Sequence, residues 1–319
     1  MALIDRVAHR LKLRDLRLLD AVVRSKSMAR AAAQLNVTQP AVSKAISELE
    51  HMLGVRLLDR SRQGIEPTPH GRALLKSGVA IFDDLRQGVR EIEFLSDPTA
   101  GDVRISAPDF IVAGILPVIL EQISRRHPRI FFEVTQNVAG SQPAQDLRER
   151  NVDLFLGRLV RARNEDDLST EILFEDPIFV VAGAHHPLVR RRKIDFTELV
   201  DELWILPRPE TAAGGFIREL FQASGRNSPP LGIACNAAKM QFDMVATGRF
   251  LGLFPRSMLH FGAKGTPIKI LPVELPRQMA TQLAPVGIVT LKNRTISPVA
   301  QLLIECARQV AKPLAKQRQ

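Results

Sequence analysis

The stretch "VTQPAVSKAIS" (residues 37–47) places several hydrogen-bonding side chains at one helical spacing. Gln39, Ser43 and Ser47 follow one another at intervals of four residues, and Lys44 lies beside them, so one helix face carries amide, hydroxyl and ammonium groups. A glutamine side chain can bond the edge of an adenine, and serine or lysine can contact bases or phosphates. These residue types at the start of a helix therefore predict contact with the major groove of DNA.

Two further helices are expected to hold this one in place. The run "LRDLRLLDAVVRS" (13–25) repeats leucine and valine at helical spacing and predicts an amphipathic core helix. Ser27 can cap a second helix, "MARAAAQL" (28–35), whose small side chains allow a neighbouring helix to approach closely. We expect a large residue at Ala32 or Ala33 to disrupt that packing.

The third helix is expected to start after a tight corner. Asn36 tolerates a left-handed backbone, Thr38 is a good N-cap, and Pro40 falls in the first turn, where no intrahelical N–H bond is lost. An apolar stripe at i, i+4, i+7 and i+11 is expected to face the other two helices. It consists of Val42, Ile46, Leu49 and Leu53.

A basic turn follows the third helix. The segments "VRLLDR" and "QGIEPT" are expected to be short strands around "SRQG", with Arg60 and Arg62 at the turn. Arginines in that position could contact a DNA backbone or minor groove. Three helices followed by such a β-wing make a winged helix-turn-helix, whereas the helices alone would also suit an ordinary all-α domain.

Residues 27–71 resemble the DNA-binding end of the LysR-type transcriptional regulators. The residue types characteristic of that family are present as Ala31, Ala32, Leu35, Thr38, Gln39, Pro40, Ala41, Ser43, Ile46, Leu49, Glu50, Leu53, Gly54, Leu57, Arg60 and Thr68. The resemblance implies operator contacts by Thr38, Gln39, Pro40, Ser43 and Lys44, with Arg60 and Arg62 on the flanking backbone. Ser27 is a further candidate DNA contact.

The overall charge agrees with a polyanionic partner. The chain of 319 residues has a net charge of +10, and its first seventy residues hold twelve Lys or Arg against seven Asp or Glu. With 45% hydrophobic and 24% charged residues, a globular protein of two or three compact units is expected. No run of about 18 uncharged apolar residues and no apolar signal-peptide core occurs, so we expect a cytoplasmic protein with no membrane partner.

Residues 69–97 are predicted to form one long helix between two domains. Its apolar residues predict a seam that repeats near 3.5 residues, which a second copy of the chain could bury, although the helix could also pack on its own domain. The seam comprises Leu75, Phe82, Leu85, Val89 and Ile92. The family resemblance favours pairing, and hence a homodimer or homotetramer that reads an interrupted palindrome in a promoter.

Beyond residue 97 the pattern changes to alternating strands and helices, which is typical of an α/β fold with a parallel sheet. Two crossings would divide residues 98–319 into lobe I (about 98–174 and 275–319) and lobe II (about 175–274), with a small ligand bound between them. This arrangement resembles the effector domain of the LysR family, itself similar to periplasmic solute-binding proteins. The predicted organisation is a winged helix-turn-helix domain at 1–68, a linker and dimerisation helix at 69–97, and a two-lobed α/β effector domain at 98–319.

Residues at the predicted strand ends are the candidate effector contacts. They are Ser106, Pro108, Asp109, Asn137, Ser141, Arg158, Thr211 and Phe254. Ser106 and Ser141 could instead only cap helices, and Arg158 could be merely solvated. Because Asp109 would repel an anion unless Arg158 neutralises it, a sugar or polyol and an aromatic acid both stay open as effectors.

Three other functions fit parts of the sequence. An enzyme is disfavoured because no GxSxG, HExxH, P-loop or Cys/His metal spacing occurs, so no catalytic residue, metal or cofactor is expected. A solute-binding protein of a transport system would share the two lobes but needs export. A redox sensor would use Cys235 and Cys306, yet neither is expected to have a cationic neighbour that would lower its pKa and favour a reactive thiolate. The sequence therefore predicts an effector-controlled, DNA-binding regulator.

Overall fold

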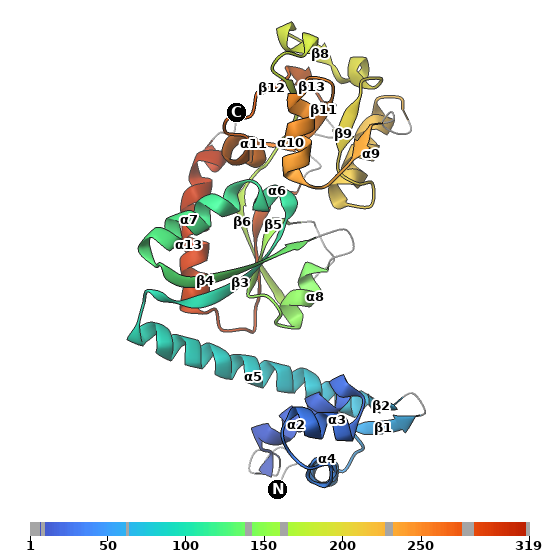
Figure 1. Cartoon of the computed structure of the whole chain (residues 1–319), viewed down its shortest axis with the longest axis vertical. Helices are drawn as coiled ribbons and strands as arrows, with labels where there is room; N and C mark the ends of the chain where they lie inside the picture. Colours follow the sequence, from blue (N-terminus) through green and yellow to red (C-terminus); the bar gives the residue numbers. More distant parts are fainter. Residues whose placement is uncertain are drawn as a thin grey trace. The chain divides into compact units, whose positions relative to one another are not determined.

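The computed structural model of the chain describes residue 7 and residues 10–61, 64–137, 142–159, 165–226, 232–275 and 284–316. The chain divides into two compact units, residues 1–86 and 87–319. The division falls inside helix α5 (Pro69–Ser96), which Figure 1 draws as one continuous helix. No helix of the described ranges is long and apolar enough to span a membrane.

The first unit consists of three helices and a two-stranded antiparallel wing. Its elements are α2 (Leu13–Ser25), α3 (Met28–Gln34), α4 (Gln39–Leu53), β1 (Leu58–Ser61) and β2 (Gly64–Pro67). The buried residues of the three helices form one hydrophobic core that the wing closes through Leu57 and Leu58. The predicted winged helix-turn-helix is confirmed.

Local signals place the helix ends where they were expected. The hydroxyl oxygens of Ser27 and Thr38 each accept a hydrogen bond of 3.4 Å from the backbone of the first helical turn. Asn36 has a left-handed φ of 53° at the corner between α3 and α4. The expectation for Ala33 was wrong: Ala32 is buried in the core, but Ala33 is exposed, because it lies on the far side of α3.

Helix α5 presents different apolar residues from those predicted. Leu75 is half-buried against the core of the first unit, so it does not belong to an exposed seam. The exposed apolar stripe is formed by Ile81, Leu85, Val89 and Ile92, with exposed fractions between 40% and 66%. This stripe starts six residues after Leu75, the first residue of the predicted seam, and it contains Ile81 in place of Phe82, which is half-buried.

Lobe I of the second unit is a five-stranded sheet in the order β4-β3-β5-β14-β6. The strands are β3 (Ala100–Pro108), β4 (Arg129–Asn137), β5 (Leu154–Arg158), β6 (Leu168–Phe174) and β14 (Val286–Leu291). Strands β3, β4 and β5 are parallel, but β14 is antiparallel to β5 and β6, so the predicted parallel sheet is mixed. The antiparallel pairing arises because the chain leaves lobe I after β6 and returns from the opposite direction.

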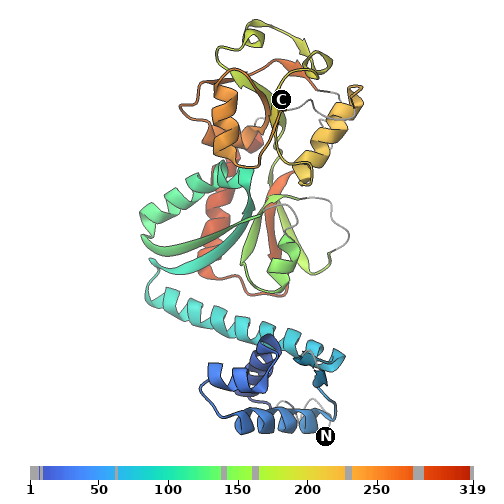
Figure 2. The ribbon, with the colours of Figure 1, turned by 45° about the vertical axis from the view of Figure 1, so that its right-hand side comes forward.

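Four helices cover the two faces of this sheet: α6 (Asp109–Val112), α7 (Ile115–Arg126), α8 (Pro143–Arg148) and α13 (Pro298–Lys316). Helices α7 and α13 pack side by side over one face, and α8 covers the other (Figure 2). The stretch "IVAGILPVILEQISRRHP" (111–128) predicts one continuous helix, but the structure divides it at Gly114 into α6 and α7. A Cβ atom on Gly114 would lie 2.6 Å from the carbonyl oxygen of Phe110, so the tight turn between α6 and α7 requires glycine.

Lobe II is built around a second five-stranded sheet in the order β10-β9-β11-β7-β12, beside a small sheet of β13 and β8. Its strands are β7 (Ile178–Gly183), β8 (Ile194–Asp195), β9 (Trp204–Leu206), β10 (Ile233–Ala234), β11 (Leu251–Pro255), β12 (Ile268–Ile270) and β13 (Val273–Glu274). Its helices are α9 (Ala212–Ala223), α10 (Ala238–Ala246), α11 (Arg256–Gly262) and the 3₁₀ helices η1 (Pro187–Arg190) and η2 (Phe196–Leu199). The ring centroids of Phe196, Trp204 and Phe221 lie 5.3–5.8 Å apart at the centre of the lobe.

Candidate functional site

The amino-terminal half of α4 combines a buried apolar face with an exposed polar one. Val42, Ile46 and Leu49 are buried at 3% exposure or less, as predicted, and Leu53 is only partly buried. On the other side, Thr38, Gln39, Pro40 and Lys44 are exposed and Ser43 is half-buried. A helix held from behind and polar in front is the geometry needed to enter a major groove.

One acidic residue lies next to this polar face. The ammonium nitrogen of Lys44 is 3.8 Å from a carboxylate oxygen of Glu48, and both side chains are largely exposed. Such a pair contributes little to stability in water. The Glu48 carboxylate does, however, place a negative charge one helical turn from Lys44, which is predicted to contact DNA.

The wing is tied to α4 by a residue that the sequence analysis counted only as a family feature. Glu50 Oε1 accepts hydrogen bonds of 2.7 Å from the amide of Leu57 and 3.2 Å from the amide of Leu58, at the start of β1. Thr68 completes the attachment, because its hydroxyl donates to the carbonyl of Arg56 at 2.8 Å. The backbone of Arg60 lies in β1, and Arg62 falls outside the described residues. Ser27 caps α3 and is half-buried.

In lobe I, four predicted effector residues meet at the carboxyl ends of β3 and β4. Ser106 is fully buried and donates a 2.8 Å hydrogen bond to Asn137 Oδ1 across the two strands. Pro108 ends β3, and Asp109 begins α6. Ser141 falls outside the described residues. The four described side chains therefore lie at one edge of the sheet, as parallel strands require.

Asp109 contacts lobe II instead of Arg158. Its Oδ2 accepts a 2.9 Å hydrogen bond from the amide of Ala238, the first residue of α10, and its Oδ1 accepts one of 2.7 Å from Gln136 Nε2. Burial raises the pKa of the Asp109 carboxyl above its ordinary value, although both hydrogen bonds act in the opposite direction. Neutralisation by Arg158, the condition under which Asp109 would tolerate an anion, has no counterpart among these contacts.

Arg158 binds both chain segments that cross between the lobes. Its guanidinium donates to the carbonyl of Asp176 at 2.7 Å, just after β6, and to the carbonyl of Ala284 at 2.9 Å, just before β14. Its Cζ atom lies 5.4 Å from the centroid of the Phe110 ring. Arg158 is therefore a hinge residue in this geometry, not a solvated one.

The two candidates in lobe II differ in accessibility. Thr211 caps α9, because its hydroxyl oxygen accepts a 3.0 Å hydrogen bond from the amide of Gly214. Phe254 is 1% exposed and stacks on Phe242 at a centroid distance of 4.9 Å, within the core of the lobe. The apolar strand β11 turns this side chain inward, so the structure offers no support for a ligand contact by Phe254.

Comparison with known proteins gives the family. Residues 96–312 match the model of the LysR substrate binding domain, and residues 13–72 match that of the bacterial regulatory helix-turn-helix protein, lysR family. The chain belongs to the LysR family of transcriptional regulators. It is accordingly a DNA-binding regulator with an effector-binding domain, and not an enzyme.

Individual relatives of this LysR-family chain are distant. It is 27% identical over 300 residues to the HTH-type transcriptional regulator GbpR of Azospirillum brasilense. The matched region covers 94% of this chain and 86% of the relative. The crystal structure of full-length CbnR complexed with its target DNA is 18% identical with a TM-score of 0.58, over 94% of this chain and 100% of the other. A full-length OxyR from Pseudomonas aeruginosa is 22% identical with a TM-score of 0.62, over 98% and 100%. These two likenesses concern the fold.

Asp176 is a hinge residue of this LysR-family domain that the sequence analysis missed. It is 2% exposed, and its carboxylate accepts hydrogen bonds from the amide and the hydroxyl of Ser257, at 2.9 and 2.7 Å, at the start of α11. Burial raises the pKa of Asp176 despite those bonds and the charge of Arg158. The only sequence signal was its place at the predicted crossing, in "FEDP".

The environment of Cys306 differs from the expectation. Cys306 does have a cationic neighbour, Arg126, whose charge lowers the pKa of the thiol. Burial raises that pKa more strongly. The net effect disfavours the thiolate, which is the reactive form in redox sensing.

Proposed function

We propose that this regulator reads its operator with the polar face of α4 and that a small effector bound between lobes I and II controls it. The observation that carries the first part is the division of α4 into a buried apolar face and an exposed polar one. The proposed contacts are Ser27, Thr38, Gln39, Pro40, Ser43, Lys44, Arg60 and Arg62. Gln39 and Ser43 would contact bases, because both side chains combine donor and acceptor groups in the first turns of the helix.

The second part of the proposal concerns the effector. Its site would lie at the carboxyl ends of β3 and β4, where Pro108, Asp109 and Asn137 gather and where lobe II approaches through Ala238. Asp109 supports a neutral, hydroxyl-rich effector over a carboxylic acid, because its carboxylate has no cationic partner among the contacts described above. A thermal-shift screen of the full chain against sugars, aromatic acids and amino acids tests this, since a bound ligand raises the unfolding temperature.

The active species would be a homodimer or homotetramer. The stripe of Ile81, Leu85, Val89 and Ile92 repeats at helical spacing on α5 and exposes apolar surface that a second copy of the same helix could bury. Two copies would present two recognition helices to the two halves of an interrupted palindrome. A regulator of chromosomal DNA acts in the cytoplasm, which is the compartment we propose.

The decisive experiment is selection of DNA duplexes from a random pool, followed by footprinting. We expect an interrupted palindrome whose binding weakens steeply with salt. The double variant Gln39→Ala/Ser43→Ala should lose at least about tenfold in affinity for the selected duplex and much of its sequence preference. The matched control is Ser124→Ala/Gln222→Ala, which removes the same side-chain types from exposed sites on α7 and α9. Equal footprints from both double variants would refute the assignment of Gln39 and Ser43.

A further inference from the structure

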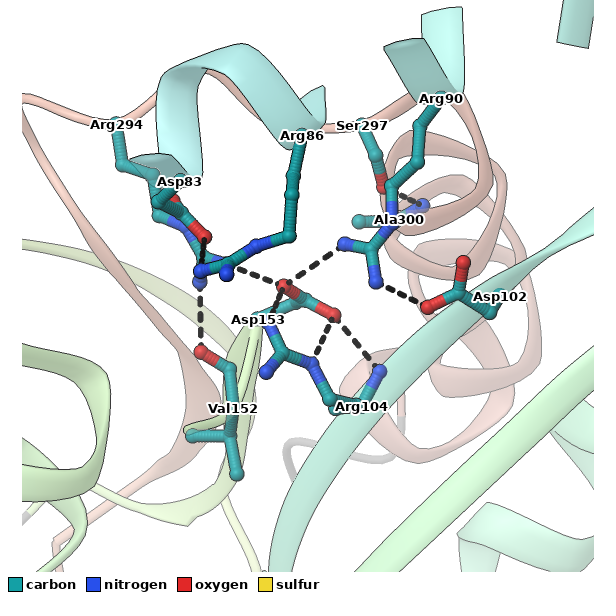
Figure 3. Close-up of polar contacts among 10 residues, drawn as sticks. All are labelled: Asp83, Arg86, Arg90, Asp102, Arg104, Val152, Asp153, Arg294, Ser297 and Ala300. Carbon is teal, nitrogen blue, oxygen red and sulfur yellow. Dashed lines mark hydrogen bonds and ion pairs between the residues drawn. The ribbon is translucent and has the colours of Figure 1, made fainter. Parts of the chain in front are cut away.

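A buried carboxylate joins three elements of the second unit at the amino ends of the lobe I strands. Asp153, directly before β5, has a side chain only 5% exposed and is surrounded by three arginines. Figure 3 shows Arg90 from α5, Arg104 from β3 and Arg294 from the segment before α13 converging on it. The Asp153 carboxylate is therefore the centre of an ion-pair network that reaches across the sheet.

Arg104 and Arg294 fix Asp153 firmly within lobe I. Asp153 Oδ2 accepts a 2.8 Å hydrogen bond from the Arg104 amide, and Oδ1 lies 2.9 Å from the Arg104 guanidinium and 2.5 Å from that of Arg294. Arg294 also donates to the carbonyl of Val152 at 2.6 Å. Burial alone would raise the pKa of Asp153, but the hydrogen bond from Arg104 and the charge of Arg294 outweigh it, so the pKa lies below its ordinary value.

Arg90 is the member that comes from the linker helix. Its guanidinium pairs with Asp102 on β3 and also lies 3.6 Å from Asp153 Oδ1, while only 17% of its side chain is exposed. Gln87 and Phe94 lie on the same face of α5, at i−3 and i+4; Gln87 is buried, and Phe94 packs against the lobe I core. The last turns of α5 are thus attached to lobe I by an apolar contact and by the charge of Arg90.

The strands that hold these partners also carry the proposed effector contacts. Arg104 precedes Ser106 by two residues on β3. Asp153 lies directly before β5 and the hinge residue Arg158 ends it, so the two are about 17 Å apart along the strand. The two strands are paired side by side in the sheet. A shift of β5 relative to β3 at their carboxyl ends would therefore change the spacing of Asp102 and Asp153, the two carboxylates that Arg90 bridges.

We propose that Arg90 is a positioning residue that holds the last turns of α5 on lobe I and transmits the effector state of β3 and β5 to that helix. Charged contacts suit this role, because a guanidinium between two carboxylates loses much of its pairing after a small displacement, whereas an apolar contact tolerates sliding. The transmission rests on the proposed effector site. The attachment of the last turns of α5 to lobe I by Arg90, which we call the anchor, does not.

The test of the anchor is hydrogen exchange in the full-length protein without added ligand. Arg90→Gln should accelerate exchange of the amides of residues 87–96 at least tenfold, and Arg90→Lys should have a smaller effect, because an ammonium cannot bridge both carboxylates. Glu91→Gln, an exposed neighbour on the same helix turn, is the control and should change nothing. Protection within α13 serves as the reference for global folding.

Two readouts separate the possible outcomes. Unchanged exchange at 87–96 in Arg90→Gln, or in Arg90→Lys if the first variant does not fold, would overturn the anchor. Footprinting on the duplex selected by the wild type should show an altered protection pattern for Arg90→Gln with affinity within threefold; an unaltered pattern would overturn the transmission. Failure of the wild type to select any duplex would instead refute the proposed DNA sites and leave the exchange result standing.

Discussion

Asp109 of lobe I accepts a 2.9 Å hydrogen bond from the backbone amide of Ala238, the first residue of α10 in lobe II. A helix amino terminus carries unpaired amides and a partial positive charge, so the Asp109 carboxylate is both a cap and a counter-charge for α10. This contact connects the lobes at the proposed effector site. Its strength should therefore influence how readily the lobes separate.

Replacing Asp109 should loosen that connection. Asp109→Ala is expected to lower the free energy of unfolding by about 1–2 kcal/mol, because it leaves the Ala238 amide without its acceptor, and to speed hydrogen exchange at the start of α10. Asp109→Asn keeps an acceptor and should cost less. Asp243→Asn, which alters only the surface pair with Lys239 on the same helix, is the control. If both Asp109 variants exchanged like the control, the lobes would be held by other contacts.

Stability in acid should depend on Asp153. Its pKa is lower in the folded protein than in the unfolded chain, so its contribution is complete above the unfolded value of about 3.9 and is lost as pH falls through the folded pKa. Asp153→Asn should therefore be destabilised by about 3 kcal/mol at pH 7, since it leaves buried arginines without their carboxylate. The difference from wild type should shrink below pH 4 in urea titrations. A difference that stayed constant to pH 3 would show that Asp153 is not the titrating group.

Removing the acidic neighbour of Lys44 should strengthen DNA binding. Glu48→Gln frees the Lys44 ammonium, which lies 3.8 Å from the Glu48 carboxylate, and removes a charge that repels phosphate. Affinity for the selected duplex should rise by about two- to fivefold at low salt and converge with the wild type at high salt, as electrostatic screening requires. Fluorescence anisotropy over a salt series measures this. Lower affinity in Glu48→Gln would mean that Glu48 itself contacts a base.

The wing should depend on Glu50. Glu50→Ala leaves the amides of Leu57 and Leu58 without their acceptor and is expected to destabilise the first unit by about 1–3 kcal/mol. Glu50→Gln retains one acceptor oxygen and should lie between. Chemical denaturation followed by hydrogen exchange in residues 57–67 detects the loss, and an intact wing in Glu50→Ala would contradict it.

Charges on the α5 stripe should dissociate the oligomer. Leu85→Glu and Ile92→Glu place carboxylates on the exposed apolar face, and each should shift sedimentation toward the monomer at micromolar concentration. Glu91→Lys, on a different face of the same helix, should not. Unchanged sedimentation in both stripe variants would place the subunit interface elsewhere.

The features that the sequence determined by itself are local ones. The caps at Ser27 and Thr38, the left-handed Asn36 and the buried stripe of α4 were all predicted, because each depends on residues within about two helical turns. The break between α6 and α7 at Gly114 is also local, but the sequence did not predict it. Its cause is the close approach of the glycine to the carbonyl of Phe110, which no hydrophobic periodicity reveals.

Only the tertiary structure decided what the charged residues of the second unit do. Arg158 was a candidate ligand contact, but folding brings the carbonyls of Asp176 and Ala284, separated by more than one hundred residues in sequence, within hydrogen-bonding distance of it. The network around Asp153 joins α5, β3 and the segment before α13 in the same way. The type of a charged residue indicates which partner it needs, but the chain path between distant strands determines which partner it meets.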